Sequence, residues 1–587
     1  MSEVLEVDKL FLFTKFKDYD WEAFEMTLQA SKDLSDKYLF PIFTEMDKKK
    51  AYYDETSKSV KAHPGLYQAI KALGEGGWIG SNSSYEQGGQ QMPITLLNAG
   101  RMIQHAANAN AAAYGLLTDG AANLIRAFAT DDLIDLYVPK MMSGVWQGTM
   151  ALTEPQAGSS LSDVKTIATP NDDGTYNIKG QKIYISGGDY EDAENIIHLT
   201  LARIDGAPIG TKGISLFVVP KYRNENGQSV SNDVVTAGLF GKMGQKGYVA
   251  AHLMMGESED CMGYLVGVPH NGLKYMFQMM NEARIGTGAM ATGTASAAYY
   301  ASLQYANERP QGRHPSSKDP NEPQVLIIEH ADVRRMLLFQ KSIVEGSAAL
   351  VLQCSYYADL AENSEGDEKE NAHLLLELLT PVVKSFPSEW GNLSVSAGMQ
   401  VLGGAGYTDD FPLEQYYRDI RVNAIYEGTT TIHGMDILGR KVMMNNGKAI
   451  QLLVLEMANT IKDASSHAHI NPYAEKLDKA SSSLRKTTSH LVEIAIKEAP
   501  EVFISDATLY LEFFGIVTIA WLWLRQGISA QKSIDNGVLE SENDFYQGKI
   551  HTMKYYFEYE LPKIDALQKR LLSDDKLTLN IESSYIN

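Results

Sequence analysis

Residues 150–160 read Met-Ala-Leu-Thr-Glu-Pro-Gln-Ala-Gly-Ser-Ser, and the texture of the sequence differs on their two sides. From Trp21 to about Met142, apolar residues recur at helical spacing, with breaks at Pro41 and at the glycine cluster 74–77. From about Val145 to Val266, short β-branched and aromatic runs alternate with turn residues, which predicts a β domain. The quoted stretch therefore joins a helical unit to a β unit.

Helical periodicity returns after the β unit, from Leu273 onward, with a glycine-rich break at 403–406. A segment rich in Ser, His, Asn and Pro at 462–473 precedes three further amphipathic segments, which predict a separate helical bundle at the C-terminus. The most apolar run, Phe513 to Leu524, is too short for a bilayer, which takes about 20 residues, so we expect a buried core helix. The expected segments are 1–40, 41–148, 149–268, 269–454 and 455–587.

Length and composition predict several soluble domains and exclude some classes of function. The chain has 587 residues, of which 44% are hydrophobic and 21% are charged, as in ordinary globular proteins. Its formal net charge is −21, which disfavours binding to nucleic acid. Two cysteines, Cys261 and Cys354, are too few for a disulfide framework or a thiolate metal site. With an acidic N-terminus that lacks a secretory pattern, we expect a cytoplasmic protein without membrane attachment or a metal.

Common catalytic signatures are missing from the sequence. It has no Gly-Lys-Ser/Thr phosphate loop, no His-Glu-x-x-His pair and no Cys-x-x-Cys pair. Gly403, Gly404 and Gly406 are similar to part of a dinucleotide fingerprint, but they follow a helical segment rather than a strand. These glycines therefore argue against a Rossmann fold.

Two segments carry the chemistry that remains. The quoted stretch leads into Gly180 to Gly188, where backbone N–H groups and the hydroxyls of Thr153, Ser159 and Ser186 could bind a flat ring and an anionic tail. The alternative is a turn with hydroxyl caps. In the second segment, 417–434, Glu427 lies between apolar Ala-Ile-Tyr and a Gly-Thr-Thr-Thr turn. Such a setting could raise the pKa of this carboxyl toward that of a general base, whereas the alternative is a helix cap.

Together, and in this order, the segments resemble the acyl-CoA dehydrogenase family over roughly residues 40–450. Leu152-Thr153-Glu154-Pro155 with Ala157-Gly158-Ser159 is similar to the first family signature. Residues 400–407 and 418–429 are similar to the second. The resemblance implies an α+β fold with an N-terminal α domain, a central β-barrel or sandwich domain and a C-terminal four-helix bundle, here followed by an extra α-helical domain. It also implies a bound FAD whose flavin lies between the β domain and the second helical domain.

The resemblance assigns roles to particular residues. Those implied to bind FAD are Met150, Leu152, Thr153, Tyr184, Ser186, Arg309, Gln400, Gly403, Gly404, Thr429 and Thr431. Those implied to bind the substrate are Ser159, Asn281, Arg284 and Gly428, and the alternative for Arg284 is a helix-surface ion pair with Glu282 or Glu308. Some members place the catalytic base before the helix arginine, but Ala283 cannot take a proton, so Glu427 is the expected base.

Two departures from the family pattern are visible. Tyr184 stands where tryptophan is common, and Pro310-Gln311-Gly312-Arg313 stands where the family has Arg-x-x-Phe-Gly. Arg309, and Gln400 together with Gly403 and Gly404, match residues that reach the FAD of a neighbouring subunit, which implies a homo-oligomer, with a dimer favoured over a tetramer. The extra residues after about 455 are similar to the subgroup containing 3-(methylthio)propanoyl-CoA dehydrogenase.

The implied reaction is the α,β-dehydrogenation of an acyl-CoA to a trans-2-enoyl-CoA, with an electron-transferring flavoprotein as acceptor. We expect a short- to medium-chain acyl-CoA as substrate, and 3-(methylthio)propanoyl-CoA is one candidate. The sequence alone does not fix the acyl chain. An acyl-CoA oxidase and a flavin-free scaffold are alternatives. A nucleic-acid-associated flavoprotein of the alkylation-response type is a third, but residues 451–587 hold 14 basic and 19 acidic residues, a net charge of −5.

Overall fold

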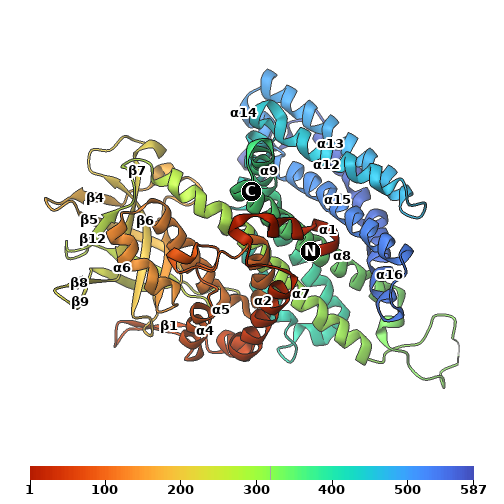
Figure 1. Cartoon of the computed structure of the whole chain (residues 1–587), viewed down its shortest axis with the longest axis horizontal. Helices are drawn as coiled ribbons and strands as arrows, with labels where there is room; N and C mark the ends of the chain where they lie inside the picture. The colour runs from red at the N-terminus through yellow and green to blue at the C-terminus, as the bar shows by residue number, and fades with distance from the viewer. Residues whose placement is uncertain (318) are drawn as a thin grey trace. The chain divides into compact units, whose positions relative to one another are not determined.

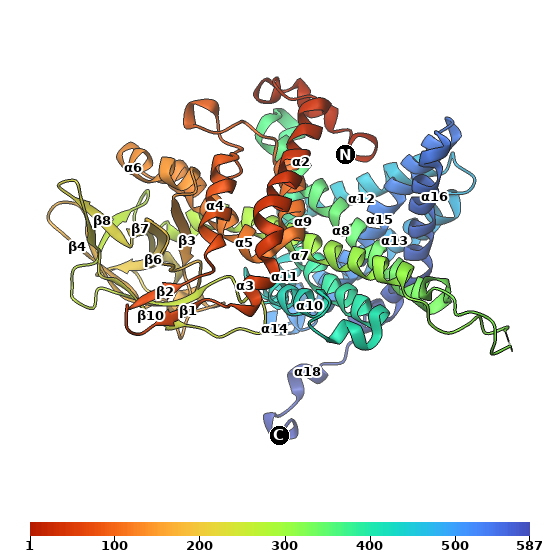
Figure 2. The same cartoon turned by 90° about the horizontal axis from the view of Figure 1, so that it is seen from below.

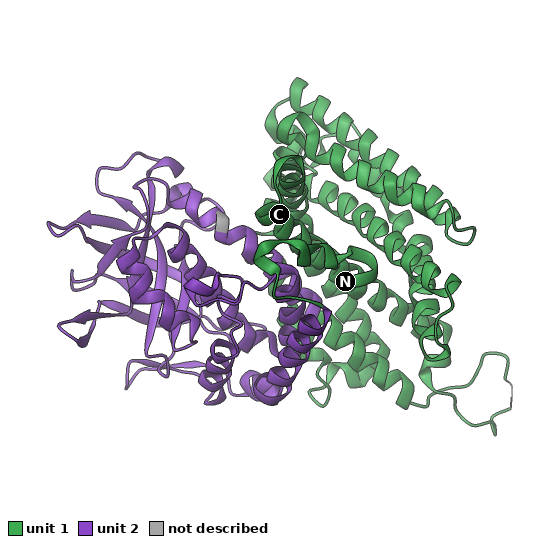
Figure 3. Ribbon diagram, viewed as in Figure 1, with its two compact units in different colours: residues 1–20, 295–587 green, residues 21–294 purple. Residues whose placement is uncertain are grey.

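The structure is a computed structural model of the whole chain (Figure 1, Figure 2), and it describes residues 1–317 and 319–587 except for the side chain at position 278. The chain forms two compact units, coloured separately in Figure 3. Unit 2 comprises residues 21–294, and unit 1 comprises residues 1–20 together with residues 295–587.

Unit 2 begins with helices that pack around one long central helix. They are α2 (Trp21–Leu34), α3 (Phe43–Lys48), α4 (Gly65–Glu75), α5 (Ile94–Phe128) and α6 (Asp131–Met142). Small residues allow close packing along α5: a Cβ at Gly148 of the next strand would lie 3.0 Å from the Thr118 backbone. The backbone of this strand therefore lies directly against the backbone of α5, and only glycine fits where the two cross.

The β domain of unit 2 contains a closed ring of strands. Its main sheet, within the described residues, consists of β3 (Trp146–Ala151), β4 (Ile167–Pro170), β5 (Tyr176–Ser186), β6 (Asn195–Ile204), β7 (Ile214–Pro220), β10 (Val234–Leu239), β11 (Ala250–Met255) and β12 (Met262–Leu265). Because β4 pairs with both β5 and β6, the path β5-β4-β6-β7-β12 returns to β5 and closes a barrel. The expected β barrel is confirmed, with β3 added on β6 and β11-β10 added on β5.

Unit 1 is almost entirely helical. Its long helices are the C-terminal part of α7 (Gly272–Glu308), which begins in unit 2, α8 (Ala331–Asn363), α9 (Gly366–Leu402), α12 (Met444–Ala464), α13 (Asn471–Lys497), α15 (Ala507–Asp535) and α16 (Glu540–Tyr555). Two shorter helices, α10 (Leu413–Ile420) and α11 (Thr430–Gly439), follow α9. Helices α8 and α9 pack against each other along their length as an antiparallel pair (Figure 1).

Helix α15 is the core helix predicted from the apolar run at 513–524. Its length and composition would suffice to cross a membrane, but 83% of its apolar window is buried inside the protein. The indole Nε1 of Trp523 donates to the Ser342 carbonyl of α8 at 2.9 Å, and that of Trp521 donates to Thr460 Oγ1 of α12 at 2.9 Å. At Gly346 of α8, a Cβ would lie 2.7 Å from Ile519 Cγ2. Helix α15 therefore lies inside the bundle rather than beside it.

We expected the C-terminal helices to form a separate bundle, but they pack against the other helices of unit 1. The helices of residues 455–587 share a core with α8, α9 and α11, and the expected boundary at 454/455 falls inside α12. The expected extension 1–40 is also divided, because α2 belongs to unit 2, whereas the first residues pack on α15. There, Arg525 Nη2 donates to the Val4 carbonyl at 2.6 Å. The first and last parts of the chain therefore meet in unit 1.

Candidate functional site

Tyr184 lies on a β-bulge of unit 2. Along the β5–β11 pairing, Ala251 faces Ile185 but Leu253 faces Lys182, so that two residues of β5 oppose His252 alone. Tyr184 adopts a φ of 58°, a left-handed conformation that is unusual for a residue with a Cβ. Tyr184 is 58% exposed, and the centroid of its ring lies 4.2 Å from that of Phe240 on the neighbouring loop. The bulge thus presents an aromatic surface that a flat ring could stack on.

The predicted flavin-binding segment lies next to this bulge. The Ile183 N–H donates to the Thr153 carbonyl at 2.9 Å, which fixes the chain just after β3 against β5. Met150, Leu152, Thr153 and Ser186 are all half-buried. Among the described residues, the hydroxyls of Thr153 and Ser186 have no hydrogen-bond partner, so both remain available to the polar edge of a ligand. This donor set beside an aromatic platform fits a flavin.

A buried ion pair between Lys182 and Glu154 supports the predicted flavin-binding segment. Lys182 and Glu154 are 0% and 3% exposed, and their Nζ and Oε1 atoms lie 2.8 Å apart. Lys182 Nζ also donates to the carbonyls of Leu201 at 2.7 Å and Leu152 at 3.2 Å. Burial lowers the pKa of Lys182 to about 8, against the attraction of Glu154. Burial opposes ionisation of Glu154 as well, but Lys182 and the hydrogen bonds from Thr166 and Lys165 outweigh it and hold the pKa of this carboxyl below its usual range.

Glu427 lies in a strained turn of unit 1. Its φ is 52° and that of Gly428 is 89°, so two successive residues are left-handed between the short helix η10 (Arg421–Ala424) and α11. Such a conformation costs a non-glycine residue roughly 1–2 kcal/mol. A Cβ at position 428 would lie 2.9 Å from His433 Nε2, so glycine is needed there for both space and φ. The turn must therefore be held by its surroundings.

Two buried side chains hold the carbonyls of this turn. Lys384 of α9 is fully buried, and its Nζ donates to the Gly428 carbonyl at 2.6 Å. His433 of α11 is also fully buried, and its Nε2 lies 3.1 Å from the Glu427 carbonyl oxygen. Because a carbonyl can only accept, that ring nitrogen carries the hydrogen. Together, the two contacts fix both peptide groups that follow Glu427, while its side chain stays half-buried.

The threonines of this turn have unequal roles. The Thr429 hydroxyl accepts from the Ile432 N–H at 3.5 Å and caps α11. Thr430 donates to the carboxylate of Glu389 on α9, which ties the start of α11 to the same helix as Lys384. Thr431 is exposed on α11. The cap explains Thr429 without a ligand, and the roles of Thr429 and Thr431 toward FAD stay predictions.

The predicted substrate residues other than Gly428 lie in unit 2. Arg284 of α7 is only 4% exposed, and its Nη1 lies 3.4 Å from Asn281 Oδ1. Arg284 is therefore buried rather than on the helix surface, and its role toward a substrate and the alternative ion pair both stay predictions. Ser159 is exposed on the loop after β3. Their contacts with a substrate stay predictions.

The residues predicted to reach a neighbouring subunit are exposed on unit 1. They are Arg309, Gln400, Gly403 and Gly404. The Tyr305 ring at the end of α7 packs edge-on against Phe411 at 5.3 Å, which brings the α7 end beside the segment that follows α9. Gly403 has a φ of 59°, and a Cβ at either glycine would meet nothing within 4 Å of this chain. The guanidinium of Arg313, beyond Arg309, bonds the carbonyls of its own loop at Glu322 and Pro320.

Three supporting residues were not predicted from the sequence, namely Lys182 in unit 2 and Lys384 and His433 in unit 1. Each is fully buried, but a lysine or histidine within an apolar run carries no signal of what it bonds. The described residues contain no group of three or more His, Cys, Asp or Glu side chains that could hold a metal ion.

We expect Lys182→Met to destabilise the protein by about 3–5 kcal/mol, because it leaves the Glu154 carboxylate buried without a cation. Adding Glu154→Gln should restore a large part of the loss, since the amide keeps an acceptor for Thr166 but carries no charge. Urea unfolding followed by circular dichroism measures both effects. Lys179→Met on the same strand is the matched control, because Lys179 is 63% exposed and its pair with Glu259 should contribute below about 1 kcal/mol. Equal losses for the two lysines would contradict this account of the pair.

Comparison with known proteins identifies the family. Models of the acyl-CoA dehydrogenase N-terminal, middle and C-terminal domains match residues 22–145, 149–255 and 270–443, and a model described as acetyl-CoA dehydrogenase C-terminal like matches 453–582. A 3-methylmercaptopropionyl-CoA dehydrogenase of Ruegeria pomeroyi is 35% identical, covering 86% of this chain and 85% of that protein. A broad-specificity linear acyl-CoA dehydrogenase of Mycobacterium tuberculosis is 31% identical, covering 100% and 97%.

The fold agrees with this assignment. A solved acyl-CoA dehydrogenase from Bacillus anthracis, complexed with FAD, superimposes with a TM-score of 0.75 at 19% identity, covering 98% of this chain and 91% of that one. The match includes the extra C-terminal helices, which lie within the matched length. The chain therefore belongs to the acyl-CoA dehydrogenase family, whose members are FAD-dependent oxidoreductases.

Proposed function

We propose that this protein oxidises a short- to medium-chain acyl-CoA to its trans-2-enoyl-CoA, with Glu427 as the base that takes the α proton. The observation that carries the proposal is the turn itself, in which a carboxylate stands on left-handed backbone held by Lys384 and His433. Backbone strain of this kind persists where function requires one fixed geometry. A carboxylate that serves only as a helix cap needs no such support, and Thr429 already caps α11.

The residues of each unit have separate tasks in this reaction. FAD, when bound, accepts the hydride that leaves the β carbon. Thr153 and Ser186 would hold the edge of its ring system and Tyr184 its face. Glu427 removes the α proton, and the rigid turn keeps its carboxylate in one position relative to the substrate. Because an acyl-CoA α proton is weakly acidic, this fixed position contributes directly to the rate.

The substrate range, the electron acceptor, the assembly and the compartment are further parts of the proposal. The names of the two relatives, one acting on 3-methylmercaptopropionyl-CoA and one on linear acyl-CoAs, support an unbranched acyl chain. Exposed Arg309, Gln400 and Gly404 support a homodimer in which each copy completes the FAD site of the other. Both cysteines are buried and free, which fits a cytoplasmic protein. We propose an electron-transferring flavoprotein as acceptor, and slow reoxidation of the reduced enzyme by air would separate it from an oxidase.

Glu427→Gln should bind acyl-CoA with little change in affinity but bleach the flavin at least about 10³-fold more slowly, because the amide cannot accept the α proton. An anaerobic stopped-flow screen of saturated acyl-CoAs of increasing chain length measures the rate and finds the preferred substrate. Glu308→Gln is the matched control, since Glu308 is exposed on α7 and bonds only Gln304. If Glu427→Gln bleaches as fast as the wild type, another base performs the reaction.

Lys384→Met should lower kcat by about 10- to 100-fold and leave KM within about threefold, because it releases the Gly428 carbonyl and lets the base move without touching the substrate. Lys384→Arg should recover part of kcat, since the guanidinium can still donate. Ligand-induced shifts of the flavin spectrum show whether the binding pocket remains intact. Loss of acyl-CoA binding together with kcat would show that Lys384 only stabilises the fold.

A further inference from the structure

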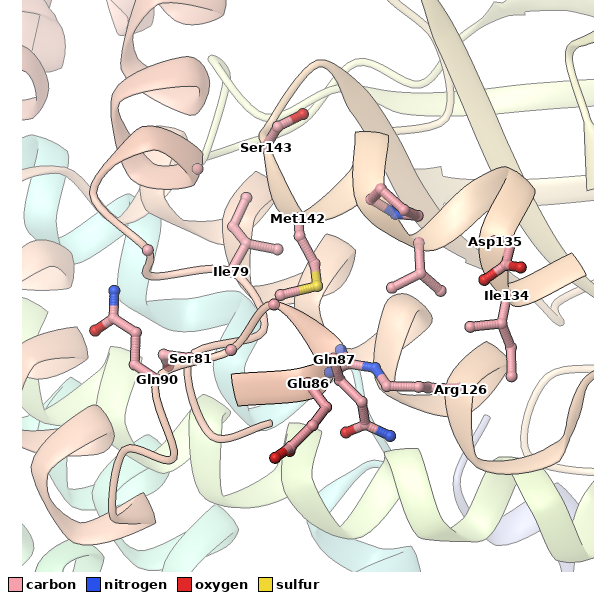
Figure 4. A pocket seen from close by; sticks show the side chains of 16 residues that line it. Ile79, Ser81, Glu86, Gln87, Gln90, Arg126, Ile134, Asp135, Met142 and Ser143 are labelled. Carbon is pink, nitrogen blue, oxygen red and sulfur yellow. The ribbon is translucent and has the colours of Figure 1, made fainter. Parts of the chain in front are cut away.

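The N-terminal helical domain of unit 2 contains a cavity that the proposed reaction does not use (Figure 4). Its volume is about 570 Å³, within the range of small-molecule sites. The end of α4, the loop 79–90, the end of α5 and the helix α6 form its walls. None of the residues predicted to bind FAD or substrate lines it.

Arg126, near the C-terminus of α5, lines this cavity with an incompletely bonded guanidinium. Its Nη2 donates to Asn123 Oδ1 at 3.1 Å. Its Nε and Nη1 are buried from solvent and have no hydrogen-bond partner. Two buried nitrogens without acceptors are costly, because their N–H groups have lost water and gained nothing in exchange. The side chain is therefore suited to receive an oxyanion, which can bond two N–H groups at once.

The protein's own carboxylates do not satisfy Arg126. The nearby Asp119 already pairs with Arg101 and accepts the Gly80 N–H at 2.6 Å. Glu86 and Asp135 line the cavity, but both are exposed, neither pairs with Arg126, and their carboxylates point away from its guanidinium in Figure 4. Burial lowers the pKa of Arg126, against the attraction of Asp119 and Glu282, but arginine stays charged in proteins.

The remaining walls are suited to an apolar body with a polar end. Ile79, Ile134, Val138 and Met142 supply apolar surface. Ser81 is buried, and its Oγ also has no hydrogen-bond partner. The cavity therefore combines an apolar wall with a hydroxyl and two guanidinium nitrogens that have no hydrogen-bond partner among the described residues. Such a combination selects an amphiphilic molecule rather than a free ion.

We propose that this cavity is a second ligand site, which binds a small amphiphile whose single oxyanion, a carboxylate or a phosphate monoester, is held by Arg126. The apolar part of the ligand packs on Ile134, Val138 and Met142. Both headgroups offer the paired oxygens that match a guanidinium. The site is distinct from the residues that the proposed reaction needs, so it stands whether or not Glu427 is the base.

Calorimetric titration of the FAD-loaded full chain with octanoate, octyl phosphate, inorganic phosphate and octanol tests the proposal. A saturating acyl-CoA thioether that cannot be oxidised keeps the catalytic pocket occupied throughout. We expect at least one of the two octyl anions to bind about tenfold or more tightly than octanol, and inorganic phosphate to bind weakly. The stronger of octanoate and octyl phosphate identifies the headgroup.

Arg126→Gln should reduce the affinity for the preferred anion at least about tenfold, to the level of octanol. Lys71→Gln on α4 is the matched control, because Lys71 pairs with Glu75 outside the cavity, and it should bind like the wild type. Met142→Trp, which fills the cavity and keeps the charge, should abolish binding and gives a second test if Arg126→Gln does not fold. Equal anion affinity in the wild type and Arg126→Gln, or no anion binding up to about 10 mM, would overturn the proposal.

Discussion

A buried lysine that donates to a backbone carbonyl supports each of the two segments to which the proposed reaction assigns a role. In unit 2, Lys182 bonds the Leu152 carbonyl beside the predicted flavin-binding segment, and in unit 1, Lys384 bonds the Gly428 carbonyl beside Glu427, the proposed base. Both ammonium groups are fully buried. Burying a charge is costly, and it persists only where the charge finds strong partners. In both places a partner is a backbone carbonyl of a segment that the proposed reaction requires to stay in a fixed position.

The strained conformations follow from this support. Tyr184 and Glu427 are both left-handed, which an isolated peptide would avoid. Tyr184 keeps its conformation because β5 pairs with β11 before and after the bulge, and because the Ile183 N–H bonds the Thr153 carbonyl. Glu427 keeps its own because Lys384 and His433 hold the next two peptide groups, and because α11 packs closely on α15. A Cβ at Gly434 would lie 2.8 Å from the Ala507 backbone. The C-terminal helix α15 thus supports the helix that follows the turn of Glu427, the proposed base.

The sequence was sufficient for the order of domains, the central β domain and the buried helix at 513–524, because periodicity and turn residues are local signals. The β-barrel or sandwich came from the family resemblance of the two motifs. The sequence was not sufficient for the supporting residues. Lys182 and Lys384 act through carbonyls that are distant in the sequence, and nothing local distinguishes them from surface lysines. The packing across the expected boundary at 454/455 could not be predicted from the sequence for a related reason. The polar segment at 462–473 reads as a linker, whereas α12 continues through the boundary and α15 returns to the core of α8 and α9.

The meeting of the first and last residues in unit 1 bears on how this protein is made. Unit 2 is continuous in sequence and can complete its fold while the ribosome is still translating. Unit 1 cannot complete its fold during synthesis, because Val4 and α8 bond Arg525 and Trp523, which are among the later residues to be translated. Until α15 has been synthesised, the apolar faces of α8 and α9 that it covers stay exposed in the nascent chain. Apolar surface that stays exposed in this way makes the incomplete chain prone to aggregation.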